Sequence, residues 1–172
     1  MKKKNLCNVM LNPQISDLSH VFTKPINDLL TLNPLILKIL TYLMFISINL
    51  SIGVVFWSFW YSNTPINTFF SVYMSKTFLN LFYHSPPPEG RFNKSIFNRA
   101  LYWSEGARSE TFFSGHTSIS IMSMLFCQPE LRIIVFPLSI FTIFMLIILR
   151  IHYIIDIAGA AAFVAAAYGV FR

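Results

Sequence analysis

Two histidines and an aspartate in the second half of the sequence have the types and spacing for nucleophilic chemistry. In "RIHYIIDIAGA", His152 and Asp156 are four positions apart, so on a helix they would share one face. The carboxylate would then accept a hydrogen bond from one ring nitrogen, fix the tautomer and raise the basicity of the other nitrogen. The spacing therefore predicts that His152 is a nucleophile or a base.

A second block, "ETFFSGHTSIS" at residues 110–120, surrounds His116 with small hydroxyl residues at the expected start of an apolar helix. Ser114, Gly115 and Thr117 would present hydroxyls and backbone N–H groups at that helix N-terminus, which favours a bound anion. Arg150 and Lys76 would add positive charge. The expected ligand is a phosphate group, carried by an amphiphilic phospholipid.

Each of these residues also has a plainer interpretation. A single histidine near a helix end is usually structural, Arg150 would serve nearly as well as an interfacial anchor, and Lys76 would be able to snorkel to a membrane interface. Two histidines and an aspartate are also enough ligands for zinc, although nothing else in the spacing calls for a metal. Because the three occur together with a small-hydroxyl cap, we favour a functional site without metal or cofactor.

The two blocks resemble the signature blocks of the type-2 phosphatidic acid phosphatase superfamily. They are most similar to its sphingomyelin synthase-like branch, which has an SGHT block and an HYxxD block. The segment "SPPPEGR" at 85–91 is similar to the proline-rich segment before the first block in that branch. The resemblance covers about residues 80–171 of this chain.

The resemblance implies a bundle of six membrane helices and phosphoryl transfer through a phosphohistidine. It implies that His152 is the nucleophile, that Asp156 orients it, and that His116 protonates the leaving lipid alkoxide. Glu110 occupies a position where synthase-like members often carry an acidic residue, which implies a supporting role in the substrate site. The substrate would be a phospholipid or a sphingolipid. The acceptor would be water in a phosphatase or a lipid alcohol in a headgroup transferase, and the sequence does not distinguish them.

The sequence also departs from the phosphatase pattern. The arginine expected six residues before the second histidine is Leu146, and the nearest arginine is Arg150. The block that runs from a lysine to Arg-Pro is missing, since Tyr83 stands seven residues after Lys76. These departures leave a second hypothesis open, a non-catalytic lipid-binding membrane protein with a degenerate site.

Composition indicates where these residues must lie. The chain has 172 residues, of which 55% are hydrophobic and 12% charged, and its long apolar runs indicate a multi-pass integral membrane protein of the all-α class. The net charge of +6 comes from scattered basic residues beside apolar runs, which is typical of membrane flanks in contact with lipids and not of nucleic-acid binding. Nothing in the sequence defines an oligomeric state.

Two domains are predicted: an interfacial or flexible segment at 1–34 and a membrane domain at 35–172. The membrane domain has about five predicted spans, at 35–60, 67–84, 115–126, 131–149 and 153–171, and a long loop at 85–113. In the second span Tyr73, Lys76, Asn80 and His84 share one helical face, which we expect to line the site. Five spans leave one family helix absent or replaced by the segment before Pro34. They would place the site on the cytoplasmic side, whereas the family's usual arrangement is exoplasmic, so the leaflet stays open.

Overall fold

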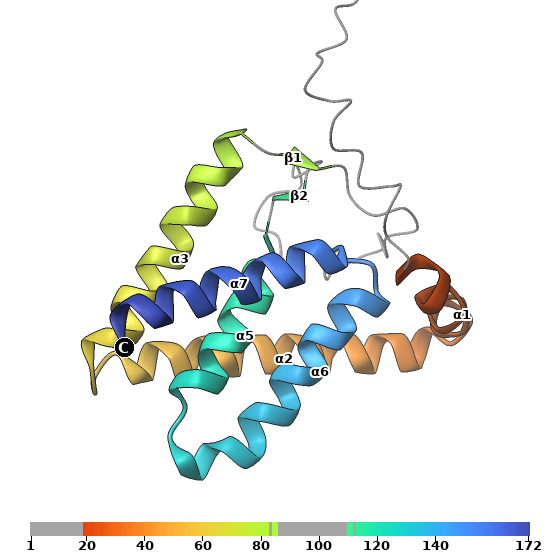
Figure 1. Ribbon diagram of the computed structural model, residues 1–172. Helices are drawn as coiled ribbons and strands as arrows, with labels where there is room; N and C mark the ends of the chain where they lie inside the picture. The colour runs from red at the N-terminus through yellow and green to blue at the C-terminus, as the bar shows by residue number, and fades with distance from the viewer. Residues whose placement is uncertain (1–18, 83, 86–109, 112) are drawn as a thin grey trace, which may run out of the picture.

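The computed structural model describes residues 19–82, 84–85, 110–111 and 113–172 (Figure 1). This part of the chain is helical, as the sequence predicts. The elements are α1 (Ser19–Leu32), α2 (Pro34–Ser58), α3 (Asn63–Phe82), α5 (Gly115–Phe126), α6 (Arg132–Ile148) and α7 (Ile154–Phe171), with a 3-10 turn at Pro129–Leu131 and two short strands, β1 (His84–Ser85) and β2 (Glu110–Thr111).

Three helical segments are long and apolar enough to cross a membrane: Pro34–Ser58, Pro129–Ile148 and Ile154–Phe171. Their length and composition support association with a membrane. Helices α3 and α5 lie where the other two spans are predicted, but α5 has only 12 residues, whereas a bilayer needs about 20.

Helix α5 lies at the centre of the bundle, in contact with α2, α3, α6 and α7 (Figure 1). Its buried residues include four small hydroxyl side chains, which allow neighbouring helices to approach closely. These are Thr117, Ser118, Ser120 and Ser123. Contacts with four helices thus fix the position of α5, and with it the position of His116 in its first turn.

Hydroxyl groups also link α2, α5 and α6 to one another. The Oγ atoms of Ser123 on α5 and Ser139 on α6 are 3.0 Å apart. On the other side of α6, Thr142 donates to the Oγ of Ser47 on α2 at 2.7 Å, and Ser47 donates to the Leu138 carbonyl at 2.7 Å. Buried hydroxyls need such partners in an apolar interior.

Two apolar clusters complete the packing. In one, residues of α2, α3, α5 and α7 surround Phe113, whose ring stacks on Phe163 at a centroid distance of 4.6 Å. In the other, α2 packs against the end of α6 around Met44 and Leu146. Leu146, which stands where the phosphatase pattern has arginine, is fully buried in this cluster. An arginine at this position would have to place its charge in an apolar core.

Within the predicted N-terminal segment, α1 packs against α2 and α6. It turns the polar residues Thr23 and Asn27 inward and leaves Ile26, Leu29 and Leu32 exposed. This orientation is the reverse of the one that a helix in water adopts. Residues 1–18 lie outside the described part of the chain.

Helix α3 ends at Phe82, two residues earlier than predicted, and His84 therefore does not lie on the helical face of Tyr73 and Lys76. Instead His84 belongs to β1, which pairs with β2 in an antiparallel register of His84 with Thr111 and Ser85 with Glu110. The reason is in the sequence, because the prolines that begin at position 86 cannot continue a helix and restrict the residue before them.

Candidate functional site

The turn between α6 and α7 carries Arg150 and His152. Arg150 has a φ of 53°, in the left-handed region. The Ile151 N–H donates to the Leu146 carbonyl at 2.9 Å, and the Arg150 N–H donates to the Ile147 carbonyl at 3.0 Å. These are the two hydrogen bonds of a Schellman motif, in which glycine usually occupies the left-handed position. Arginine there strains the backbone by about 1–2 kcal/mol.

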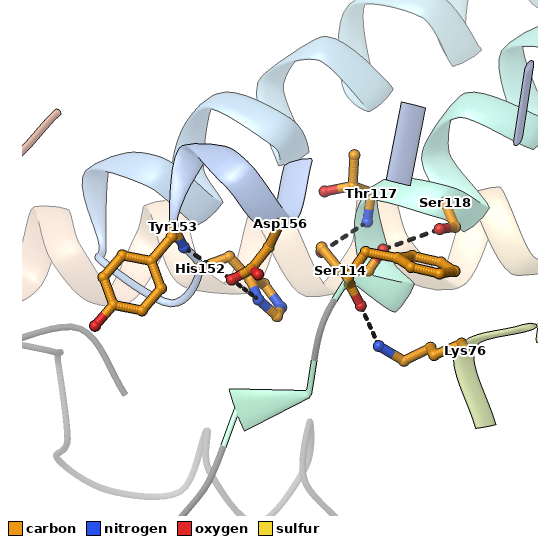
Figure 2. A network of polar contacts seen from close by, with 8 residues as sticks. Lys76, Ser114, Thr117, Ser118, His152, Tyr153 and Asp156 are labelled. Atoms are coloured by element: carbon orange, nitrogen blue, oxygen red, sulfur yellow. Dashed lines mark hydrogen bonds and ion pairs between the residues drawn. The ribbon is translucent and has the colours of Figure 1, made fainter. Parts of the chain in front are cut away.

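Asp156 holds the residues that precede α7. Its Oδ2 accepts a hydrogen bond from the Tyr153 N–H at 3.2 Å and lies 3.6 Å from the His152 Nδ1 (Figure 2). The sequence correctly pairs Asp156 with His152, but the predicted geometry is wrong, because α7 begins only at Ile154 and His152 precedes it. The carboxylate instead caps the first turn, where the helix dipole stabilises a negative charge.

Ser114 is the N-cap of α5. Its Oγ accepts the Thr117 N–H at 3.1 Å, and its carbonyl accepts the Ser118 hydroxyl at 3.0 Å (Figure 2). Its own N–H donates to the Asp156 carbonyl at 3.1 Å. The N–H groups of Ser114 and Thr117, which the sequence predicts to bind an anion, therefore have partners within the protein.

The bond from Ser114 to the Asp156 carbonyl joins the two sequence blocks directly. As a result the rings of His116 and His152 approach to 6.2 Å between centroids, with an angle of 54° between their planes. Asp156 is 1% exposed and His152 is 6% exposed, while His116 is half-buried. The structure thus brings together the three residues that the sequence singled out.

Helix α3 holds the first block from its other side. The Lys76 Nζ donates to the Phe113 carbonyl and lies 5.3 Å from the centroid of the Phe113 ring. The Tyr73 hydroxyl donates to the Gly115 carbonyl at 3.3 Å. Figure 2 shows Lys76 extending from α3 towards the segment that leads into Ser114. The shared helical face of Tyr73 and Lys76 was visible in the sequence, but their use of backbone carbonyls was not.

Gly115 leaves room beside these two side chains. A Cβ atom at this position would lie 3.6 Å from the Lys76 Cε and 3.8 Å from the Tyr73 hydroxyl, which is ordinary contact. The space therefore does not by itself require glycine. The carboxylate of Glu110 and residues 86–91 of the proline-rich segment lie outside the described part of the structure.

The described residues contain no group of three or more His, Cys, Asp or Glu side chains placed to hold a metal ion. Comparison with models of known protein families, with curated proteins and with solved structures finds no match to this chain. The functional interpretation therefore depends on the geometry of the site and on the sequence blocks that form it.

Proposed function

We propose that the protein is a membrane-embedded lipid phosphatase or lipid headgroup phosphotransferase that acts through a phosphohistidine, similar to the sphingomyelin synthases. The observation that carries this proposal is the approach of His116 and His152 to 6.2 Å, with the Asp156 carboxylate 3.6 Å behind His152. Before reaction, a well-placed nucleophile lies about 3–3.5 Å from the atom that it attacks. A general acid lies within about 3 Å of the atom that it protonates. One phosphoryl group between the two rings meets both requirements.

In the first step His152 attacks phosphorus through Nε2, because its Nδ1 faces Asp156. The N–P bond forms as the bond from phosphorus to the lipid oxygen breaks, and protonated His116 gives its proton to the leaving alkoxide. The products are a phosphohistidine and a lipid alcohol. The Asp156 carboxylate stabilises the positive charge that develops on the imidazole.

In the second step neutral His116 takes a proton from the acceptor hydroxyl, and the acceptor oxygen attacks phosphorus and releases His152. Water as the acceptor gives hydrolysis, and a lipid alcohol gives headgroup transfer. Arg150 supplies positive charge for the phosphoryl oxygens from the turn that also carries His152. Lys76 supplies a second positive charge beside the start of α5.

The proposal includes a multi-pass arrangement in which α2, α3, α5, α6 and α7 all cross the membrane. The site then lies where α5 and α7 begin, at the end of two crossing helices, and a phospholipid or sphingolipid would reach it laterally. Large exposed apolar side chains along α2 and α6, such as Ile46 and Phe144, support contact with lipid acyl chains. Both signature blocks lie at this end of the bundle.

The alternative function is lipid binding without catalysis. Two observations favour it: Leu146 occupies a fully buried apolar position where the phosphatase pattern has an arginine, and the Ser114 and Thr117 N–H groups already have partners. A site that binds a phosphate weakly would retain a lipid without turning it over. The two functions differ in whether His152 becomes phosphorylated.

The test uses the full chain purified in detergent, with fluorescent phosphatidic acid, or with fluorescent ceramide and phosphatidylcholine. Wild type is expected to release phosphate or form a new headgroup lipid, and to give an alkali-stable, acid-labile phosphoenzyme with labelled phosphatidic acid or phosphatidylcholine. The variant His152→Ala should form no phosphoenzyme, and His116→Ala should form it far more slowly. Arg132→Ala, at the exposed start of α6, is the control. Turnover that survives His152→Ala would exclude this nucleophile, and lipid binding without turnover in wild type would favour the alternative.

A further inference from the structure

The end of α6 is held by a residue from the distant N-terminal helix. The last carbonyls of a helix lack partners within it and must find them elsewhere. Here the carbonyls of residues 145, 146 and 147 accept N–H groups of the turn that follows. The next carbonyl, that of Ile148, accepts a hydrogen bond from the Nδ2 of Asn27 on α1 at 2.9 Å, across 121 positions of sequence.

The orientation of α1 indicates that this hydrogen bond is specific. Asn27 is 6% exposed, and Thr23 one turn earlier is also buried, whereas Ile26, Leu29 and Leu32 face outward. In contact with lipid, apolar side chains face outward and polar groups have to find partners within the protein, and α1 has this arrangement. Because a buried amide without a partner costs free energy, the contact with Ile148 selects the orientation in which Asn27 points at the end of α6.

We propose that Asn27 is a positioning residue that fixes the turn bearing Arg150 and His152. Ile148 is the last residue of α6, and the strained Arg150 follows two positions later. A strained conformation persists only where its surroundings hold it. Without the donor from Asn27, the Ile148 carbonyl loses this hydrogen bond to α1, and the turn relaxes. The consequence for catalysis rests on the proposed phosphoryl transfer by His152. A displacement of this side chain by about 1 Å would reduce turnover by up to about 100-fold.

The experiment compares Asn27→Leu, which keeps the branched shape of the side chain but removes the donor, with Asn49→Leu. Asn49 is an exposed asparagine on α2 whose Nδ2 donates to the carbonyl of Phe45 within its own helix at 2.8 Å. Both are made in the full chain in detergent. Two quantities are measured: kcat for folded protein with fluorescent phosphatidic acid or phosphatidylcholine, and amide hydrogen exchange over residues 149–152.

For Asn27→Leu we expect kcat to fall about tenfold and exchange over 149–152 to become faster, while Asn49→Leu resembles wild type in both. A purely structural role would lower the melting temperature but leave the kcat of folded protein and this exchange unchanged, and that result would overturn the proposal. If Asn27→Leu does not fold, Asn27→Gln keeps the amide but displaces it by one methylene. It should give smaller changes in the same direction.

The two measurements also separate this proposal from the proposed function. If wild-type protein forms no phosphoenzyme, the proposed effect of Asn27 on catalysis is excluded. Hydrogen exchange over residues 149–152 then decides alone whether Asn27 holds the turn. A wild type with turnover, together with an Asn27→Leu variant of unchanged kcat and exchange, removes the positioning role and leaves the proposed function intact.

Discussion

Arg150 combines a charge that the proposed site needs with a backbone conformation that suits glycine. This makes two substitutions informative together. Both Arg150→Ala and Arg150→Gly remove the guanidinium, but only glycine relieves the left-handed strain. We therefore expect Arg150→Gly to be more stable than Arg150→Ala by about 1 kcal/mol, while both lose substrate turnover to the same extent.

The measurement is the free energy of unfolding in detergent, with phosphoenzyme formation as the functional readout. Ala161→Gly, at an exposed position within α7, is the control and should show the usual order, with glycine less stable by about 1 kcal/mol. Equal stability of the two Arg150 variants would mean that the turn is not strained.

Asp156 has two partners, and one substitution separates them. Asp156→Asn keeps a side-chain oxygen that accepts the Tyr153 N–H, but it loses the negative charge that faces His152. The cap of α7 should survive, so we expect unfolding by heat to change little. Turnover should fall by roughly 10²–10⁴-fold, because the imidazole loses its orienting charge. Asp28→Asn on the exposed face of α1 is the matched control. An active Asp156→Asn variant would contradict the orienting role.

At the residue scale the sequence predicts the participants of the site better than their geometry. The pairing of His152 with Asp156 follows from their spacing, whereas the approach of His116 to them is what the resemblance to the phosphatase superfamily implies. The contact between His152 and Asp156 across a helix start does not follow from the spacing, because it depends on where α7 begins. The hydrogen bond from the Ser114 N–H to the Asp156 carbonyl cannot be predicted from residue type, because any residue except proline would supply the same N–H group. The role of Asn27 depends on a tertiary contact that no local pattern encodes.

At the scale of the elements, pairs of hydroxyl groups hold helices together. Such pairs matter in a membrane because contact between apolar side chains contributes little free energy to helix association in lipid. The pair of Ser47 and Thr142 permits a double-mutant cycle with Ser47→Ala and Thr142→Val. We expect Thr142→Val to lower the free energy of unfolding by about 0.6–1.7 kcal/mol, with most of the loss absent in the Ser47→Ala background. Thr77→Val is the control, because the Thr77 hydroxyl bonds within α3. Additive effects would show that the pair does not couple α2 to α6.

The helices themselves were predictable because apolar runs of bilayer length dominate this sequence. Helices α2, α6 and α7 lie close to their predicted spans. Helix α3 begins at Asn63, four residues before its predicted span, and ends two residues early because of the prolines after position 85. The inward polar face of α1 was not predictable. A pattern of apolar residues identifies the hydrophobic face of a helix, but it does not show whether that face contacts protein or lipid.

On the scale of the whole molecule, the two ends of the bundle are chemically different. At one end lie the site residues and the starts of α5 and α7. At the other, the start of α3 meets the end of α7, where the Thr64 hydroxyl donates to the Phe171 carbonyl at 3.0 Å. The connection between α2 and α3 and the one between α5 and α6 also lie away from the site (Figure 1). Five crossing helices would place these two ends on opposite sides of a membrane.

That arrangement predicts the accessibility of single cysteines in sealed vesicles. In a background with Cys7 and Cys127 replaced by serine, Ser62→Cys and Glu130→Cys should react with an impermeant maleimide from the same side, because both exposed positions lie at the end opposite the site. Asn33→Cys, exposed between α1 and α2, should react from the other side. The physical reason is that charged reagents do not cross the bilayer and each crossing helix reverses direction. Reaction of Ser62→Cys and Glu130→Cys from different sides would mean that only one of α3 and α5 crosses the membrane, and an arrangement of four crossing helices would replace the five.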